Sequence, residues 1–147
     1  MALVLKKLPL PGCSPGTPWS LRALGTKQSC EVLEFLADIK ESSPQSFKKI
    51  TAVMSRAAKA GPQFHNKEIC KRFKGLDYSG FLEFKGKVKG GHAVRILGFI
   101  DEGNLIICSH GFSKKDRETP PGELDKLIAA RKKYIQAKNR KQITFED

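Results

Sequence analysis

The sequence predicts an α+β domain in which an N-terminal helical hairpin packs on a small antiparallel β-sheet, followed by a C-terminal helix. Three observations support this fold class. Apolar residues recur at helical spacing between residues 32 and 58, strand-like alternation occupies residues 81–108, and a further helical pattern begins at Pro121. A length of 147 residues suits one such domain.

The hairpin is expected to follow a short first strand at residues 19–24. The second helix starts with Ser43 as its N-cap and Pro44 at the first helical position, and a Gly-Pro pair ends it. A short polar turn joins the two helices, which predicts that they run antiparallel. Their apolar faces consist of Val32, Phe35, Leu36 and Ile39 in the first helix, and Phe47, Ile50, Met54, Ala57 and Ala58 in the second.

The middle of the chain changes to a strand-like period. Residues 67–73 are expected to form a short helical turn. Residues 81–85 and 93–96 then alternate between polar and apolar, with two glycines between them, and the turn-forming residues 101–104 precede a β-branched run at 105–108. This pattern predicts a three-stranded antiparallel meander.

The last predicted helix has acidic residues in its first turn and basic residues near its end, which complement the helix dipole. It completes a single domain expected at residues 18–138. Residues 1–17 are rich in proline and are expected to form a disordered extension. Residues 139–147 are expected to form a flexible tail.

Charge is the most informative feature of the composition. The chain has 27 Lys and Arg residues against 15 Asp and Glu residues, a formal net charge of +12. The excess is spread along the chain and is not confined to one tail. It favours polyanionic partners, such as nucleic acid, a ribosome, an anionic membrane or an acidic protein. We place nucleic acid ahead of the alternative that the basic surface only aids solubility.

Two other features of the sequence narrow the class of protein. The four cysteines, Cys13, Cys30, Cys70 and Cys108, form no CxxC pair and no spacing typical of a zinc site, so we interpret them as reduced cytoplasmic thiols and expect no metal. No apolar run approaches the roughly 20 residues that a membrane-spanning helix needs. The sequence therefore predicts a cytoplasmic protein without membrane association.

Several local motifs resemble those of one bacterial family. Gly80–Lys85 resembles a G-x-x-E-[LF]-[RK] strand, Val94–Leu97 resembles the arginine-bearing strand that follows it, and His110–Lys115 with a later Thr119-Pro120 resembles an H-G-F-x-K-K…T-P signature. Val32–Leu36 is typical of the first helix. Together these motifs are similar to the RelE superfamily of toxins, in its HigB-like, phage-derived branch, and the similarity covers residues 19–138.

This resemblance implies a function. Such a protein is the toxin of a type II toxin–antitoxin system, a metal-independent endoribonuclease without cofactors that cuts messenger RNA at the ribosomal A site, close to 16S rRNA. A helix-turn-helix antitoxin holds it inactive. The alternative is a RelE-fold module that binds RNA, the ribosome or a repressor partner without cutting. Asp116–Glu118 favours it, because it replaces an aromatic residue that related enzymes use for base stacking.

Arg95 is the first candidate catalytic residue. If residues 102–103 form a two-residue turn, Arg95 lies directly opposite His110 on one sheet face. The residues expected to share this face are Leu97, Phe99 and Cys108. By resemblance, Arg95 contacts the scissile phosphate and stabilises the transition state. The alternative is a structural ion pair with Glu83 or another carboxylate.

The position of Lys85 depends on the preceding loop. A three-residue loop, 89–91, places Lys85 opposite Arg95, whereas a two-residue loop, 90–91, turns Lys85 to the other face. We favour the longer loop, because it gathers Lys85, Arg95 and His110 on one face.

The remaining candidates are further cations. By resemblance, Lys114 or Lys115 acts near the phosphate as general acid or charge stabiliser, although both could be solvated loop lysines. His110 is a candidate acid or base, or equally a hydrogen-bonded core residue. Two basic groups are expected to bind RNA phosphates, although the first could simply protect an exposed sheet edge. They consist of Lys85, Lys87 and Lys89, and of Lys71, Arg72 and Lys74.

Overall fold

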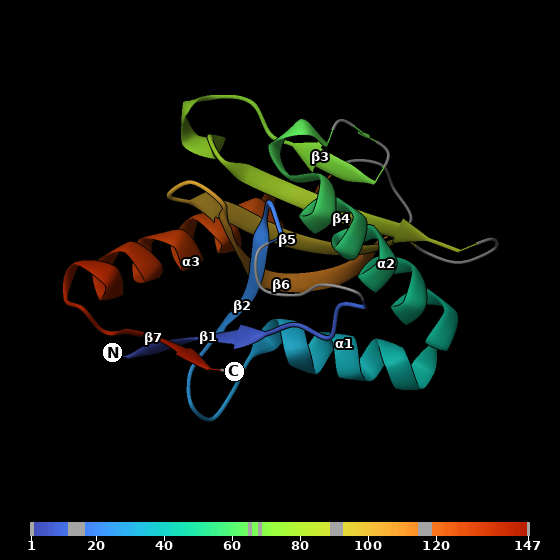
Figure 1. Cartoon of the computed structure of the whole chain (residues 1–147), viewed down its shortest axis with the longest axis horizontal. Helices are drawn as coiled ribbons and strands as arrows, with labels where there is room; N and C mark the ends of the chain where they lie inside the picture. Colours follow the sequence, from blue (N-terminus) through green and yellow to red (C-terminus); the bar gives the residue numbers. More distant parts are fainter. Residues whose placement is uncertain are drawn as a thin grey trace.

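The computed structural model confirms the α+β class. It describes residues 2–11, 17–64, 66–67, 69–88, 93–114 and 119–146. Within these residues, three α-helices pack on one mixed sheet of seven strands (Figure 1). The elements are β1 (Leu3–Lys7), β2 (Ser20–Gly25), α1 (Glu31–Ser42), α2 (Pro44–Ala60), β3 (Cys70–Arg72), β4 (Phe81–Lys87), β5 (Ala93–Asp101), β6 (Leu105–Lys114), α3 (Pro121–Asn139) and β7 (Ile143–Glu146), with 3-10 turns at Gly61–Gln63 and Leu76–Tyr78.

The sheet has the strand order β3-β4-β5-β6-β2-β1-β7. Strands β4, β5 and β6 form the predicted antiparallel meander. Two pairings are parallel, namely β2 with β6 and β1 with β7. The sheet is therefore larger than the predicted one, and it is mixed instead of antiparallel.

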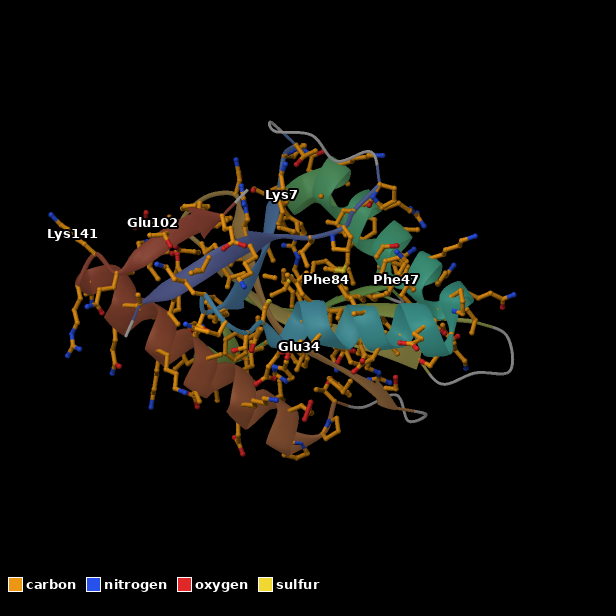
Figure 2. All side chains as sticks on the ribbon, turned by 90° about the horizontal axis from the view of Figure 1, so that it is seen from below. Lys7, Glu34, Phe47, Phe84, Glu102 and Lys141 are labelled. Atoms are coloured by element: carbon orange, nitrogen blue, oxygen red, sulfur yellow. The ribbon has the colours of Figure 1, made fainter. Side chains whose placement is uncertain are left out.

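The helices lie in two layers on opposite faces of the sheet (Figure 1). Because side chains alternate along β5, Val94 and Ile96 pack under the α1–α2 hairpin, and Leu97 and Phe99 pack under α3. Figure 2 shows Phe84 of β4 inside the molecule, near the hairpin. The sheet thus separates two apolar clusters, one for each helical layer.

The hairpin forms as predicted. Ser43 is the residue between the two helices and Pro44 opens α2. The hydroxyl of Ser43 donates to Ser46 Oγ at 2.8 Å, and no side-chain cap bond reaches the helix backbone. Proline at the first helical position is therefore the stronger of the two start signals here.

The predicted disorder at residues 1–17 is wrong for its first part. Residues 3–7 form β1, and Leu5 is fully buried against the α3 layer. The predicted flexible tail is also wrong at residues 143–146, which form β7 beside β1. The apolar run Leu-Val-Leu at residues 3–5 is buried in the sheet, and this burial favours order at the N-terminal end. The largely exposed β7 is held by its pairing with β1. The domain therefore extends beyond residues 18–138.

The helical turn predicted at residues 67–73 is also wrong. Residues 70–72 form β3, an edge strand that pairs antiparallel with β4. Cys70 is buried opposite Phe84, and this burial holds the segment in the sheet.

Candidate functional site

The candidate site lies on the face of the β4–β5–β6 meander that α3 covers. The strand register determines which residues of the three strands lie side by side, and we call each such set a row. Arg95 lies opposite Lys85 on β4 and Phe112 on β6. His110 lies one row away, opposite Leu97. The predicted Arg95–His110 pair is therefore wrong, although both residues belong to the same sheet face.

A longer turn and a β-bulge together cause this difference. Asp101 pairs with Leu105, so the turn between β5 and β6 has three residues, 102–104, instead of the predicted two, 102–103. The β5–β6 register shifts between Leu97 and Gly98, so that Gly98 pairs with Cys108 while Leu97 pairs with His110. Ser109 is the extra residue, and it moves every later β6 side chain by one position. The three-residue turn alone places Cys108 opposite Gly98 and in the core under the hairpin, on the face opposite to the predicted one, because Cys108 precedes the bulge. Sequence pattern alone gives no sign of this bulge.

The other half of the register prediction is confirmed. Lys85 pairs with Arg95 and Lys87 with Ala93, as the three-residue loop requires. Residues 89–91, and with them Lys89, lie outside the described residues.

Arg95 is closed to solvent. Its residue exposure is 1%, and its Nη1 atom lies 3.3 Å from Oε1 of Glu83, which is 2% exposed. The Thr119 hydroxyl donates to the second carboxylate oxygen of Glu83 at 2.5 Å. A buried guanidinium requires such an anion, because an unpaired buried charge is costly. The arrangement matches the structural ion pair, and the described geometry leaves Arg95 no access to a phosphate.

His110 is also buried, with 2% exposure. Its Nδ1 atom lies 2.9 Å from Ser109 Oγ, and its Nε2 atom lies 3.3 Å from Glu123 in the first turn of α3. Burial lowers the pKa of His110, as does the charge of Lys126, against the opposing effect of the Glu123 carboxylate. The imidazole is therefore neutral at pH 7 and packed under α3, which fits a core role.

Lysine positions occupy the last two rows of the same face. Gly86 turns toward α2, where an added Cβ would lie 2.9 Å from the Ile50 nitrogen. Its neighbours Lys85, half-buried, and Lys87, exposed, therefore face away from the hairpin. Lys87 pairs with Ala93, which pairs in turn with Lys114. We call Lys85, Lys87 and Lys114 the lysine end of the meander.

Two predicted residues of this region are not described in full. The backbone of Lys114 ends β6, but its side chain lies outside the described part of the structure. Lys115 also lies outside it, together with residues 116–118. Their predicted catalytic roles stay predictions.

Lys71 and Arg72 lie elsewhere, on the edge strand β3. They line a groove of about 540 Å³ together with residues that the sequence analysis did not single out. The complete lining consists of Phe64, Lys67, Cys70, Lys71, Arg72, Phe73 and Lys74, and we call it the basic–aromatic groove. The interleaving of cations and phenylalanine over residues 71–74 is the signal that points to it.

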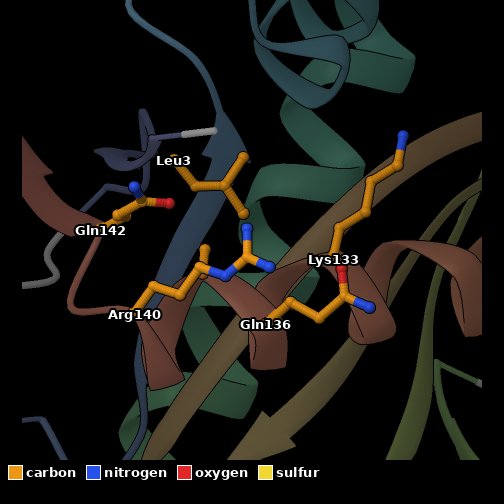
Figure 3. Close-up of a pocket in the computed structure, with 6 residues that line it drawn as sticks. Leu3, Lys133, Gln136, Arg140 and Gln142 are labelled. Carbon is orange, nitrogen blue, oxygen red and sulfur yellow. The ribbon is translucent and has the colours of Figure 1, made fainter.

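A smaller cavity of about 260 Å³ lies at the C-terminal end of α3 (Figure 3). Figure 3 shows the Arg140 guanidinium beside Leu3 of β1, and the amides of Gln136 and Gln142 complete the polar lining with Lys133. This cavity is remote along α3 from Glu123, which contacts His110 in the first turn. It therefore does not belong to the candidate site.

Metal and thiol chemistry receive no support from the described residues. No group of three or more His, Cys, Asp or Glu side chains among them is placed to hold a metal ion. Cys30, Cys70 and Cys108 are free and buried, and burial raises the pKa of the Cys70 thiol to about 11. Cys13 lies outside the described residues. No helix in the described parts of the chain is both long and apolar enough to span a membrane.

Comparison with known proteins supplies the family. The family model described as Phage derived protein Gp49-like (DUF891) matches residues 37–133. The match runs from α1 into α3 and includes the meander and the groove. No curated protein matches the chain. The matching family stands in the context of RelE/HigB-like toxin–antitoxin systems. The chain therefore belongs to the phage-derived Gp49-like family.

Proposed function

We propose that this protein is the toxin of a type II toxin–antitoxin system, and that it cleaves messenger RNA on the ribosome as a metal-independent endoribonuclease of the HigB-like, RelE-fold type. The family context, the net charge of +12 and the HigB-like motifs support this proposal. Its partners would be a helix-turn-helix antitoxin and, in the cytoplasm, the ribosome with its 16S rRNA and bound message.

The observation that carries the proposal is the lysine end of the meander. Lys85 lies beside the buried Arg95 on the α3 face, Lys87 lies one row further at the end of β4, and the backbone of β6 ends at Lys114 in the row of Lys87. The partial exposure of Lys85 and the exposure of Lys87 support a contact with a phosphodiester, whereas Arg95 is buried. We therefore assign the phosphate contacts to the lysines, with Lys115 next to them in sequence.

The chemistry needs three events that cations assist. The 2′-hydroxyl loses its proton and its oxygen attacks the adjacent phosphorus, while the bond to the 5′-oxygen breaks and that oxygen takes up a proton. Negative charge grows on the phosphorane in between, and lysine ammonium groups stabilise it. A neutral lysine can accept the first proton and a charged one can supply the second.

Arg95 then has a structural role in the same protein. Its ion pair orients Glu83, which accepts the Thr119 hydroxyl, so the pair fixes the chain four residues after Lys115 against the sheet. The second candidate function is RNA binding without cleavage, and the burial of Arg95 is the observation that favours it.

Induced expression of three variants tests the proposal. We expect the wild-type chain to arrest growth and to produce new 5′ ends within translated messages, detected by primer extension. Lys115→Ala, and Lys85→Ala combined with Lys87→Ala, should reduce cleavage by about 100-fold. Lys48→Ala with Lys49→Ala, which removes two exposed cations from α2, should leave cleavage unchanged.

Three outcomes would count against this assignment. Growth arrest without new 5′ ends would favour the binding module. Unchanged cleavage in both site variants would exclude the lysine end as the site. An equal loss in the α2 control would mean that total charge, and not these lysines, determines activity.

A further inference from the structure

The basic–aromatic groove follows the free edge of the sheet at β3, one strand away from the lysine end of the meander. The two regions are joined through the backbone, because the Lys85 amide donates to the Ile69 carbonyl at 2.9 Å. Side chains on β3 alternate. Arg72 lies over the Trp19 ring, at 5.1 Å from its centroid, and Lys71 over the Phe73 ring, at 4.8 Å. Cations thus flank the groove from both faces of the sheet.

The charge of the groove selects an anionic ligand. Four of its seven lining residues are cationic, and no acidic side chain lines it among the described residues. Lys67, Arg72 and Lys74 are exposed, and no described carboxylate forms an ion pair with them. Arg72 donates one hydrogen bond to the Pro62 carbonyl at 2.8 Å, so its other N–H donors, together with Lys67 and Lys74, are available to phosphate groups.

The aromatic lining favours nucleic acid over other polyanions as the ligand of the groove. Phe64 and Phe73 are half-buried, so part of each ring still reaches the groove. Bases stack on such rings whatever their identity, while neighbouring cations follow the backbone. An acidic protein segment would use the charges but not the rings. A duplex would keep its bases stacked inside and away from them.

We propose that the basic–aromatic groove binds an unpaired stretch of RNA, with one or more bases against Phe64 or Phe73 and the flanking phosphates on Lys67, Lys71, Arg72 and Lys74. The inference rests on the proposed function in that the target is RNA. It adds a second subsite at the β3 edge, outside the lysine end of the meander. A strand held at the lysine end would continue over β3 into this groove.

The chain carries its own reporter for this site. Trp19 is its single tryptophan, it is buried, and the Arg72 guanidinium covers it. Phosphate binding to Arg72 should change the environment of the indole. We therefore expect single-stranded hexaribonucleotides to change tryptophan fluorescence, and the anisotropy of the labelled RNA to report affinity in parallel.

Matched substitutions then test stacking. Phe64→Leu and Phe73→Leu should each weaken binding of the hexamer about fivefold or more, if the replaced ring stacks a base. The control is Phe145→Leu on β7, because Phe145 is an exposed phenylalanine under an arginine, Arg22, at the opposite edge of the sheet. It should leave affinity unchanged. Thermal unfolding checks that each variant is folded.

Ligand probes without accessible bases complete the experiment. Polyphosphate of matched charge, and an RNA duplex of the same length, should bind with equal affinity to the wild type and to Phe73→Leu. Equal weakening of hexamer and polyphosphate binding by Phe73→Leu would overturn base stacking. Unchanged hexamer affinity in both phenylalanine variants would overturn the subsite.

The result is separable from the proposed function. If the phenylalanine variants bind RNA normally while the Lys85→Ala, Lys87→Ala variant does not, the groove proposal fails and the toxin proposal stands. If the phenylalanine variants lose affinity for RNA and the wild-type chain creates no new 5′ ends, the groove stands and cleavage fails.

Discussion

At the scale of single residues, the buried pair of Arg95 and Glu83 is the most consequential feature. Strand alternation and the longer hairpin loop correctly predict that Arg95 faces the same side as Lys85. They do not predict burial, because Thr119 lies far away in sequence and reaches Glu83 only in the folded chain. Candidate residues on a sheet face can be read from the sequence, but their access to substrate cannot.

The ion pair predicts a large effect of one conservative change. Glu83→Gln should lower the free energy of unfolding by about 3–5 kcal/mol, because it leaves the Arg95 charge buried without its carboxylate. Urea unfolding of the purified variant measures this. The control is Lys126→Met, which removes the exposed pair with Glu31 and should change stability by no more than about 1 kcal/mol. Equal small losses in both would contradict a structural role for the pair.

His110 predicts a pH dependence. Since burial holds its pKa below the ordinary value, the unfolded chain binds the proton more readily than the folded chain. Its contribution to stability is therefore retained above about pH 6.5 and declines as the pH falls below that value. The difference in unfolding free energy between wild type and His110→Asn should accordingly shrink from pH 7.5 to pH 5.5. A difference that grows on acidification would mean that the Glu123 contact, and not burial, dominates.

At the scale of elements, local patterning predicts what depends on neighbours in sequence. The amphipathic hairpin, the meander with its short turns and α3 follow from residues close together, and all are present. The pairings of β1 with β7 and of β2 with β6 join distant segments, so periodicity gives no information about them. The three-residue turn at 102–104 and the bulge at Ser109 each shift β6 by one position, and together they move His110 one row from its predicted place.

Strand β1 carries a testable consequence of this kind. Leu5→Ala should lower the free energy of unfolding by about 2–5 kcal/mol, because the Leu5 side chain is fully buried in the α3 layer. Lys7→Ala, on the exposed end of the same strand, should change it by less than about 0.5 kcal/mol. Chemical denaturation compares them. Equal effects would restore the interpretation of residues 1–17 as a disordered extension.

At the scale of the whole molecule, the positive charge divides into groups with different roles. Lys138, near the end of α3, forms ion pairs with Asp101 and Glu102, so its role is structural. Lys87 of the lysine end, and Lys67, Arg72 and Lys74 of the basic–aromatic groove, are exposed cations on β4 and on or beside β3. The sequence predicts the excess of charge and part of both groups. The sequence cannot predict which cations form ion pairs in the folded chain, because their acidic partners lie on other elements.

The parallel pairing of β1 with β7 brings the two ends of the polypeptide to one rim of the molecule, opposite β3 (Figure 1). Leu3 lies beside Ile143 and Lys6 beside Glu146, so the ends are about one short strand length apart, on the order of 10 Å. A fluorophore, a surface tether or a fused protein attached at either terminus would thus leave the β3 rim clear. The same adjacency makes the chain a natural substrate for head-to-tail cyclisation by a short peptide.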